Sequence, residues 1–265
     1  MGSATREALV SARAALTAQG GTADLATGEA LLAAARVIGS SPQLLTALSD
    51  NGAEPEAKKA LVSSVFSSTV TPAALALLGE VAAARWSDAD DVLEGIEDLG
   101  LRVVAASSPA GTDVDAELFA FGRTVSSNAE LELALSSKLG SNEAKASLVD
   151  TLLAGKASTQ AVVILSHLVQ QPRGRRIGEL VRYAASVVAA ESGYAVATVT
   201  SATVISDAQV ERLAAGLSAK YGRDLRINQV VDPSVIGGLR VQVGDDIIDG
   251  SVAKRLDDVR LQLAG

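Results

Sequence analysis

The sequence predicts a mainly α-helical protein with a small α/β domain at its C-terminal end. Three observations support this fold class: helical spacing of apolar residues over 1–191, an internal repeat within that part, and alternating strand patterns after residue 193. Apolar residues make up 48% of the 265 residues and aromatic residues only 3%. Small aliphatic side chains must therefore fill the core, which favours long helices in close contact.

Capping residues mark the boundaries of the predicted helices. Apolar residues recur at helical spacing over 5–19 and again over 24–38. Further helix starts are predicted at Ser41-Pro42, at Thr71-Pro72, and at Ser87 with Asp90 three residues later. The helix that begins at Ser87 is expected to end near residue 106, before a short Ser, Pro and Gly linker.

An internal repeat is the strongest organisational feature of the chain. A shift of 87 residues aligns the helical part with itself without gaps. The aligned pairs include Leu48 and Leu135, Lys58 and Lys145, Ser41 and Asn128, and Thr71 and Ser158. Matching caps carry more weight than matching Ala or Leu, which an Ala-rich chain supplies by coincidence. We therefore predict two related helical bundles in tandem, over 1–106 and 112–191.

Residues 193–265 carry strand and helix signals in the order β-α-β-β-β-α. The expected elements are a strand over 194–200, a helix from a capping box at Ser206 to a stop at Gly222, strands over 225–231, 239–243 and 247–249, and a helix capped at Ser251. Gly244 and Asp245 predict a hairpin turn. The last helix places Val252, Leu256, Val259 and Leu263 on a narrow apolar seam, which suits docking on another helix or on the sheet.

Composition argues against several functions. The net charge is −8, so the basic surface that nucleic-acid binding usually needs is missing. The chain has no cysteine, which excludes disulfides, thiolate metal sites and cysteine nucleophiles. Its single histidine, His167, lies in an apolar helical run without an orienting partner nearby in the sequence. We predict that His167 is a surface or boundary residue and not a general base, and we predict no cofactor.

Three local patterns have both a functional and a structural interpretation. Asp245, Asp246 and Asp249 suggest a cation site, but their spacing is not that of a calcium loop, and Asp is common in turns. Gly237-Gly238 lacks a phosphate-binding glycine pattern and predicts a bulge or tight turn. We therefore predict no metal and no nucleotide site. Trp86, at a predicted helix end, is either a hydrophobic plug or an interface residue.

The N-terminal segment predicts neither a signal peptide nor a membrane span. Arg6 and Glu7 are not followed by an apolar stretch, and the longest uncharged run, 60–79, is broken by hydroxyl residues and Pro72. Met1-Gly2-Ser3 is either a native start or a cloning remnant. Taken from the residues alone, the chain is expected to be a scaffold whose helix grooves bind partner helices.

The C-terminal segment carries a specific resemblance. Residues 231–245 read VDPSVIGGLRVQVGD, and Ile248-Asp249-Gly250-Ser251-Val252 follows. This pattern resembles the signature of the delta subunit of F-type ATP synthases, the family that includes the mitochondrial oligomycin-sensitivity-conferral protein. We expect a structural role for its signature residues, Asp232, Pro233, Gly237, Gly238, Gly244, Asp249 and Ser251. Residues 118–191 resemble the family's helical bundle, and the repeat extends the likeness to 1–106.

The chain departs from the family pattern by its duplication. An ordinary member has one six-helix bundle before its α/β domain, whereas this chain resembles high-GC bacterial members with an extra bundle. In some bacteria the delta part is fused behind a membrane-anchored b-type stalk helix, and residues 1–265 are compatible with a part of such a fusion. The first helix of the second bundle is either the one at 88–106 or the one at 5–19. Which bundle contacts the catalytic head is left open.

The resemblance implies a non-catalytic stator subunit. Members of the family sit on the catalytic head, where their helical bundle holds N-terminal helices of the alpha subunits and their C-terminal domain holds the b-type stalk. The resemblance thus places the chain at the cytoplasmic face of the bacterial plasma membrane, attached only through partners or a fused stalk helix. The alternatives are a helical scaffold of another assembly and a small hydrolase that uses His167.

Two sets of apolar residues are the predicted partner contacts. The candidate groove residues for a partner helix are Leu9, Leu16, Leu75 and Leu78 in the first bundle and Val162 and Leu165 in the second. The candidate stalk-docking residues are Val252, Leu256, Val259 and Leu263. Core packing is the competing interpretation of the groove set, because apolar helix positions are usually internal.

Overall fold

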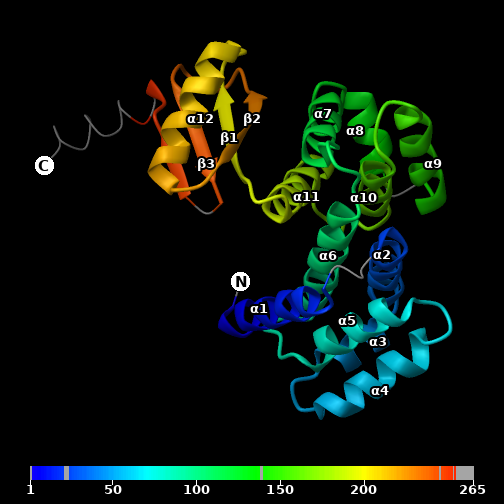
Figure 1. The fold of residues 1–265 in the computed structure, drawn as a ribbon. Coiled ribbons are helices and arrows are strands. Elements are labelled where there is room, and N and C mark those ends of the chain that lie inside the picture. The colour runs from blue at the N-terminus through cyan, green and yellow to red at the C-terminus, as the bar shows by residue number, and fades with distance from the viewer. Residues whose placement is uncertain (1, 21–23, 138–139, 245, 253, 255–265) are drawn as a thin grey trace, which may run out of the picture. The chain divides into compact units, whose positions relative to one another are not determined.

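Twelve helices and four strands build the part of the chain that the structure describes, which confirms the predicted fold class (Figure 1). The structure is a computed structural model that describes residues 2–254 apart from 21–23, 138–139, 245 and 253. The chain divides into two compact units, 1–188 and 189–265. The first contains α1 (Ser3–Ala18), α2 (Leu25–Ser40), α3 (Pro42–Ser49), α4 (Pro55–Phe66), α5 (Pro72–Ala83), α6 (Ala89–Ala106), α7 (Val114–Ser126), α8 (Ala129–Ser136), α9 (Asn142–Leu153), α10 (Thr159–Gln170) and most of α11 (Ile177–Glu191).

Two of the predicted helix starts are confirmed. The Ser41 hydroxyl accepts a hydrogen bond from the Leu44 N–H at 3.3 Å, and Pro42 occupies the first turn of α3. The Thr71 hydroxyl does the same for the Ala74 N–H at 3.1 Å, before Pro72 in α5. Both hydroxyls satisfy a donor that the first helical turn leaves without an intrahelical partner.

The capping pair predicted at Ser87 is wrong. The helix begins one residue later, with Asp88 accepting a hydrogen bond from the Asp90 N–H at 3.1 Å. A carboxylate at that position also interacts favourably with the helix dipole. Ser87 instead joins α1 to this segment, because its N–H donates to the Thr5 hydroxyl at 3.1 Å and its own hydroxyl accepts from the Thr5 N–H at 3.3 Å.

The helix bounds follow the 87-residue shift. Adding 87 to the bounds of α3, α4 and α5 gives the bounds of α8, α9 and α10 residue for residue. The same shift places α1 on α6 and α6 on α11, within two residues at each end. Helix α6 is thus both the counterpart of α1 and the counterpart of α11, which favours 88–106 as the first helix of the second repeat. The division into bundles over 1–106 and 112–191 stays a prediction.

Helix α6 runs through the core of the helical unit. It packs against α1, α2, α3, α5 and α10, and it is buried around its whole circumference. Trp86 fills the space beside it: its ring lies where a Cβ at Gly95 would stand, and its indole N–H donates to the Val81 carbonyl at 2.8 Å. Trp86 is only 1% exposed, so it is a hydrophobic plug and not a surface contact.

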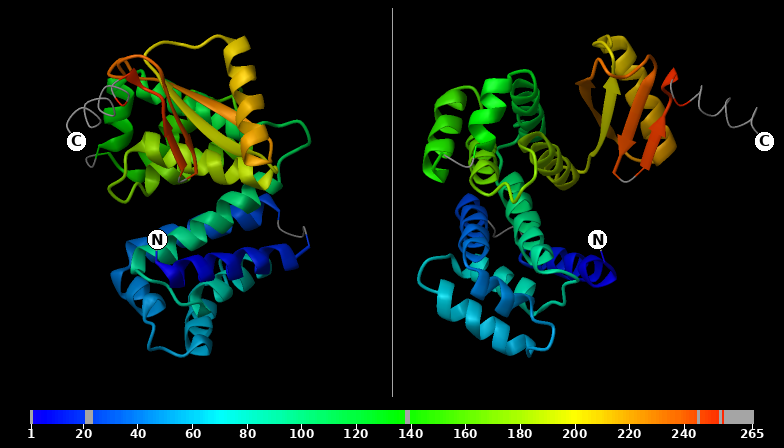
Figure 2. Two further views of the ribbon diagram at one scale, coloured as in Figure 1. Left: turned by 90° about the vertical axis from the view of Figure 1, so that its left-hand side faces the viewer. Right: turned by 180° about the vertical axis from the view of Figure 1, so that it is seen from behind.

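In its described part, the second unit is a four-stranded sheet with one helix on its face (Figures 1 and 2). Its elements are β1 (Ala195–Ser201), α12 (Asp207–Tyr221), β2 (Leu225–Val231), β3 (Leu239–Val243) and β4 (Asp246–Asp249), and the strand order is β2-β1-β3-β4. Helix α12 connects the parallel pair β1 and β2, while β3 pairs antiparallel with both β1 and β4. Alternate β1 residues are buried against α12, as the period of two predicts.

Local signals predicted this unit well. The Ser206 N–H donates to the Gln209 side chain at 3.0 Å, which forms half of the predicted capping box. Gly222 ends α12 in the left-handed conformation, with φ of 66°. Within the part of the chain that is described, no single helix has the length and apolarity to cross a bilayer; α2 and α3 together meet that test but are bent by 104°.

Candidate partner-binding groove and charged network

A groove of about 560 Å³ lies on the helical unit between α1, α4 and α5. Its lining is mainly apolar and includes the half-buried Leu75 and the buried Val62 and Leu77. On α5, Glu80 is held at 3.0 Å from the Lys59 ammonium of α4. An apolar floor with a few charges is the usual composition of a helix-binding groove.

Small residues line the α1 side of the groove. Ala15 and Ala18 face it from α1, and Ala76 faces it from α5 with its side chain exposed. The Gln19 side chain donates to the Ala73 carbonyl at 3.3 Å and so ties the end of α1 to the beginning of α5. Small side chains leave room for another backbone to approach closely.

The structure places the predicted groove residues differently from one another. Leu75 lines the groove, and Leu16 is half-buried beside the core. Leu9 and Leu78 are buried, at 5% and 1% exposure. In the second repeat, Val162 is half-buried and Leu165 is buried. Their part in partner binding stays a prediction.

Sequence periodicity missed much of the groove lining. Ala15, Ala18, Lys59 and Ala76 carry no apolar stripe that would single them out. The available signal was the run of small residues in Pro72-Ala-Ala-Leu-Ala-Leu-Leu-Gly79, in which Ala76 is exposed.

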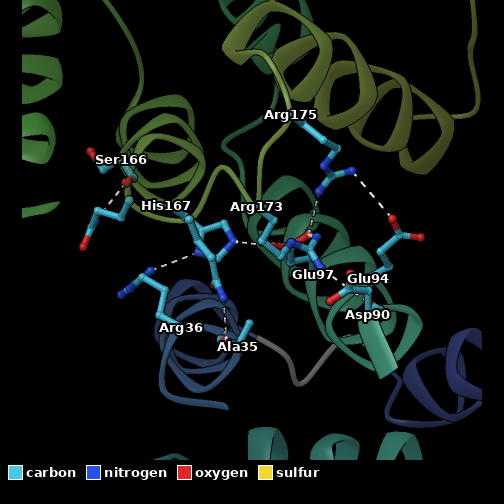
Figure 3. Close-up of polar contacts among 11 residues, drawn as sticks. Ala35, Arg36, Asp90, Glu94, Glu97, Ser166, His167, Arg173 and Arg175 are labelled. Carbon is cyan, nitrogen blue, oxygen red and sulfur yellow. Dashed lines mark hydrogen bonds and ion pairs between the residues drawn. The ribbon is translucent and has the colours of Figure 1, made fainter. Parts of the chain in front are cut away.

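A buried charged network surrounds Glu97 of α6 (Figure 3). We name it the Glu97 cluster, and it consists of Arg36, Glu94, Glu97, His167, Arg173 and Arg175. The Glu97 carboxylate, 4% exposed, pairs with Arg173 and lies 3.5 Å from Arg175, both in the turn between α10 and α11. It also accepts a hydrogen bond from His167 Nε2 of α10 at 3.2 Å. Residues far apart in sequence therefore meet on one carboxylate.

The hydrogen bonds fix the tautomer of His167. Arg36 of α2 donates from Nη1 to His167 Nδ1 at 3.0 Å, and guanidinium groups can only donate. Nδ1 is therefore the acceptor, and Nε2 carries the proton that is donated to Glu97. His167 is 1% exposed, so the predicted surface or boundary position is wrong. The reason is that α2 and α6, distant in sequence, both cover the face of α10 that carries it.

We expect the stability of the helical unit to fall in mild acid because of His167. Burial lowers the pKa of His167 below its ordinary value of 6.5, so the unfolded chain binds a proton at higher pH than the folded chain does. The contribution is intact above about pH 6.5 and is lost as the pH falls toward the folded pKa, at up to about 1.4 kcal/mol per pH unit. A proton on Nδ1 would displace Arg36 and add a positive charge near Arg173, which the Glu97 carboxylate opposes.

Urea unfolding at several pH values between 7.5 and 5 measures this effect. Trp86, the only tryptophan, reports on the helical unit by its fluorescence. The variant His167→Gln keeps a neutral polar side chain and should show a flatter dependence on pH. If the stability of His167→Gln falls equally steeply with pH, His167 is not the cause of the pH dependence.

A second buried carboxylate follows directly on α6. Asp98, with its side chain fully buried, accepts two hydrogen bonds from Arg13 of α1, at 2.8 and 2.9 Å. Arg102, one turn later on α6, donates to it at 2.8 Å. Burial raises the pKa of Asp98, but the hydrogen bonds from both arginines outweigh burial and hold that pKa below its ordinary value.

The signature residues of the second unit build its turns. Asp232 accepts from the Ser234 N–H, and Asp249 accepts from the Ser251 N–H, each at 2.9 Å. Gly237, Gly238 and Gly244 have φ of 66°, 78° and 59°, as the predicted turns require. A Cβ at Gly238 would collide with the Gly250 carbonyl. The geometry accounts for these residues by backbone conformation, and a role in partner binding is untested.

Two predictions fall partly outside the described residues. Val252 is 42% exposed, while Leu256, Val259 and Leu263 of the predicted docking seam lie outside the described residues. Asp245 of the predicted acidic turn also lies outside them. Among the residues that are described, no three His, Asp or Glu side chains are grouped in a way that could hold a metal ion.

Comparison with known proteins identifies the family. Residues 101–263 match the family model described as the ATP synthase delta (OSCP) subunit. ATP synthase subunit delta of Leifsonia xyli subsp. xyli is 56% identical over 265 residues and covers all of both chains. This chain belongs to the ATP synthase delta (OSCP) subunit family. The resemblance predicted from the C-terminal signature is confirmed.

Other relatives of the delta subunit family match the added N-terminal helices as well. ATP synthase subunit delta of Kineococcus radiotolerans is 42% identical over 253 residues, which is 94% of this chain and 91% of that one. The protein of the same name from Streptomyces avermitilis is 36% identical over 267 residues, 98% of each chain. Among solved structures, a chain of the Toxoplasma gondii mitochondrial ATP synthase hexamer aligns with 63% of this chain and 95% of its own length, at 19% identity and a TM-score of 0.42, and adds nothing to the assignment.

Proposed function

We propose that this chain is a non-catalytic stator subunit of an F-type ATP synthase. It links the catalytic head to the b-type stalk and resists the torque of the rotor, at the cytoplasmic face of the bacterial plasma membrane. The observation that supports this role most strongly is the family membership over nearly the whole chain, with full-length relatives named ATP synthase subunit delta. A stator link needs stiffness and slow dissociation, and neither requires a titrating residue.

The groove between α1, α4 and α5 is the proposed binding site for an N-terminal helix of an alpha subunit. Its length along α5, its apolar floor and its small α1 residues suit the apolar face of a single amphipathic helix. The Lys59 and Glu80 pair supplies charges of both signs for the polar edge of that helix. This assignment places the head contact in the first repeat, the choice that the sequence leaves open.

The second unit is the proposed contact for the b-type stalk. Beside the turn that carries the signature glycines, it exposes Ile236 at 68% and Val252 at 42%. Exposed apolar side chains close to one another mark an interaction surface more often than isolated ones do. The predicted docking seam continues from Val252. Together with the groove, this surface would give the chain one contact to the head and one to the stalk.

The variant Ala76→Glu should weaken binding to the alpha subunit. Ala76 is exposed on the groove wall, so the change adds bulk and charge to the groove without disturbing the core. Titration calorimetry of the whole chain with a peptide of the alpha-subunit N-terminal helix measures the effect. We expect the affinity to fall at least about tenfold, equivalent to 1.4 kcal/mol.

Ala134→Glu is the matched control. Ala134 is an exposed alanine of α8, away from the groove, and the same substitution there should leave the affinity unchanged. Equal binding by Ala76→Glu and the wild type would rule out this groove as the site. No binding by the wild-type chain, with a peptide competent to form a helix, would count against the alpha-subunit contact itself.

A further inference from the structure

The Glu97 cluster joins helices that lie before and after α6 in the chain (Figure 3). His167 bonds at one ring nitrogen to Arg36 of α2 and at the other to Glu97 of α6. The turn after α10 adds a second connection to α2, because the Gln171 side chain donates to the Ala35 carbonyl at 3.3 Å. One carboxylate thus organises contacts among α2, α6, α10 and the 171–176 turn.

The neighbouring carboxylate serves a different side of α6. Side chains of successive helix residues point about 100° apart. Glu97 and Asp98 therefore contact different neighbouring helices. Asp98 is bound by Arg13 of α1, whereas Glu97 is bound by His167 of α10 and by the arginines of the turn. Loss of the Glu97 contacts would therefore free α10 and the turn while leaving α1 attached.

The backbone of the turn depends on the same contact. Arg173 has φ of 46°, a left-handed conformation that is strained for a residue other than glycine. Its guanidinium pairs with Glu97 and donates to the Asp90 carbonyl at 3.4 Å. A strained conformation persists only where its surroundings hold it, and here the ion pair to α6 is what holds it.

Charge balance makes Glu97 the member that the cluster needs most. Arg173 and Arg175 pair with the two carboxylates, and Arg36 adds a third positive charge through its bond to His167. Glu94 lies 3.7 Å from Arg175 with its side chain 29% exposed, while the Glu97 side chain is 4% exposed. Without the Glu97 charge, the Arg173 guanidinium would lose the carboxylate that compensates its charge at a largely buried position.

We propose that Glu97 is an ionic latch that holds α10 and the 171–176 turn on α6, so that the helices on either side of α6 move as one body. The latch transmits force through the helical unit without any bound partner, and it does not depend on the contacts proposed above. When the Glu97 charge is removed, the turn relaxes, α10 separates from α2 and α6, and the two sets of helices reorient relative to each other.

Distance measurements between paired spin labels test the latch. The chain has no cysteine, so Val65→Cys on α4 and Leu133→Cys on α8 introduce the only label sites, and both residues are exposed. In the full chain we expect a single narrow distance distribution. Glu97→Gln should broaden the distribution and should speed amide exchange in α10 and the turn at least about tenfold. Asp90→Asn, which removes an exposed carboxylate in the first turn of the same helix, is the matched control and should change neither.

The variant Arg173→Gly examines the same contact from the turn. Glycine relieves the backbone strain at this position but removes the guanidinium. If the ion pair holds the turn, the variant should broaden the distance distribution. If only the backbone strain matters, the variant should instead slow amide exchange in α10. This variant decides the question if Glu97→Gln does not fold. The proposal is overturned if the folded variants keep the narrow distribution and the wild-type exchange, or if the distribution of the unaltered chain is already broad.

Discussion

Asp98→Asn lowers the free energy of unfolding of the helical unit by about 3 kcal/mol, the lower end of the cost of breaking a buried ion pair from one side, because the Arg13 side chain is 43% exposed. Asparagine has almost the same shape as aspartate but no charge, and its amide hydrogens would face the donors of Arg13 and Arg102. Both guanidinium groups would lose their hydrogen-bonded counter-ion. Because Arg13 lies on α1, the loss also weakens the attachment of α1 to α6.

Urea unfolding followed by the fluorescence of Trp86 measures this change, since Trp86 packs against Gly95 of the same helix. Asp90→Asn is the control: Asp90 is an exposed acid in the first turn of α6, and its loss should cost at most about 1 kcal/mol through the helix dipole. Equal stabilities of the two variants would show that Asp98 is not a structural ion pair.

The turns and strands of the second unit could be predicted because their signals are local. The capping box at Ser206, the left-handed stop at Gly222 and the glycines of the signature each act within a few residues of their own position. The strands between them follow from a period of two. Sequence reasoning therefore gave the bounds of β2 and β3 without error.

The interior of the helical unit could not be predicted in the same way. Helical spacing shows that a helix has an apolar face but not which distant helices cover its other faces. His167 is buried because of Arg36, 131 residues earlier, and Glu97, 70 residues earlier. Taken alone, Arg36 and Glu97 each have the sequence context of a charged residue that faces solvent. The one available signal was the adjacent acidic pair Glu97-Asp98 in the middle of a long helix, next to the apolar residues Ile96 and Leu99.

The two predicted repeats share helix α6 within one compact unit. Helix α6 is the counterpart of α1 and of α11, and it packs against helices of both repeats. A shared helix removes one flexible connection between the repeats. For a stator this is useful, because torque is transmitted through packed helices more stiffly than through a linker.

The central claim, that this chain couples the catalytic head to the stalk, is tested most directly by ATP-driven proton pumping in membrane vesicles. Vesicles from which this subunit has been removed should still hydrolyse ATP but should form no proton gradient, and adding back the wild-type chain should restore pumping. A full proton gradient in vesicles that lack the chain would contradict the account.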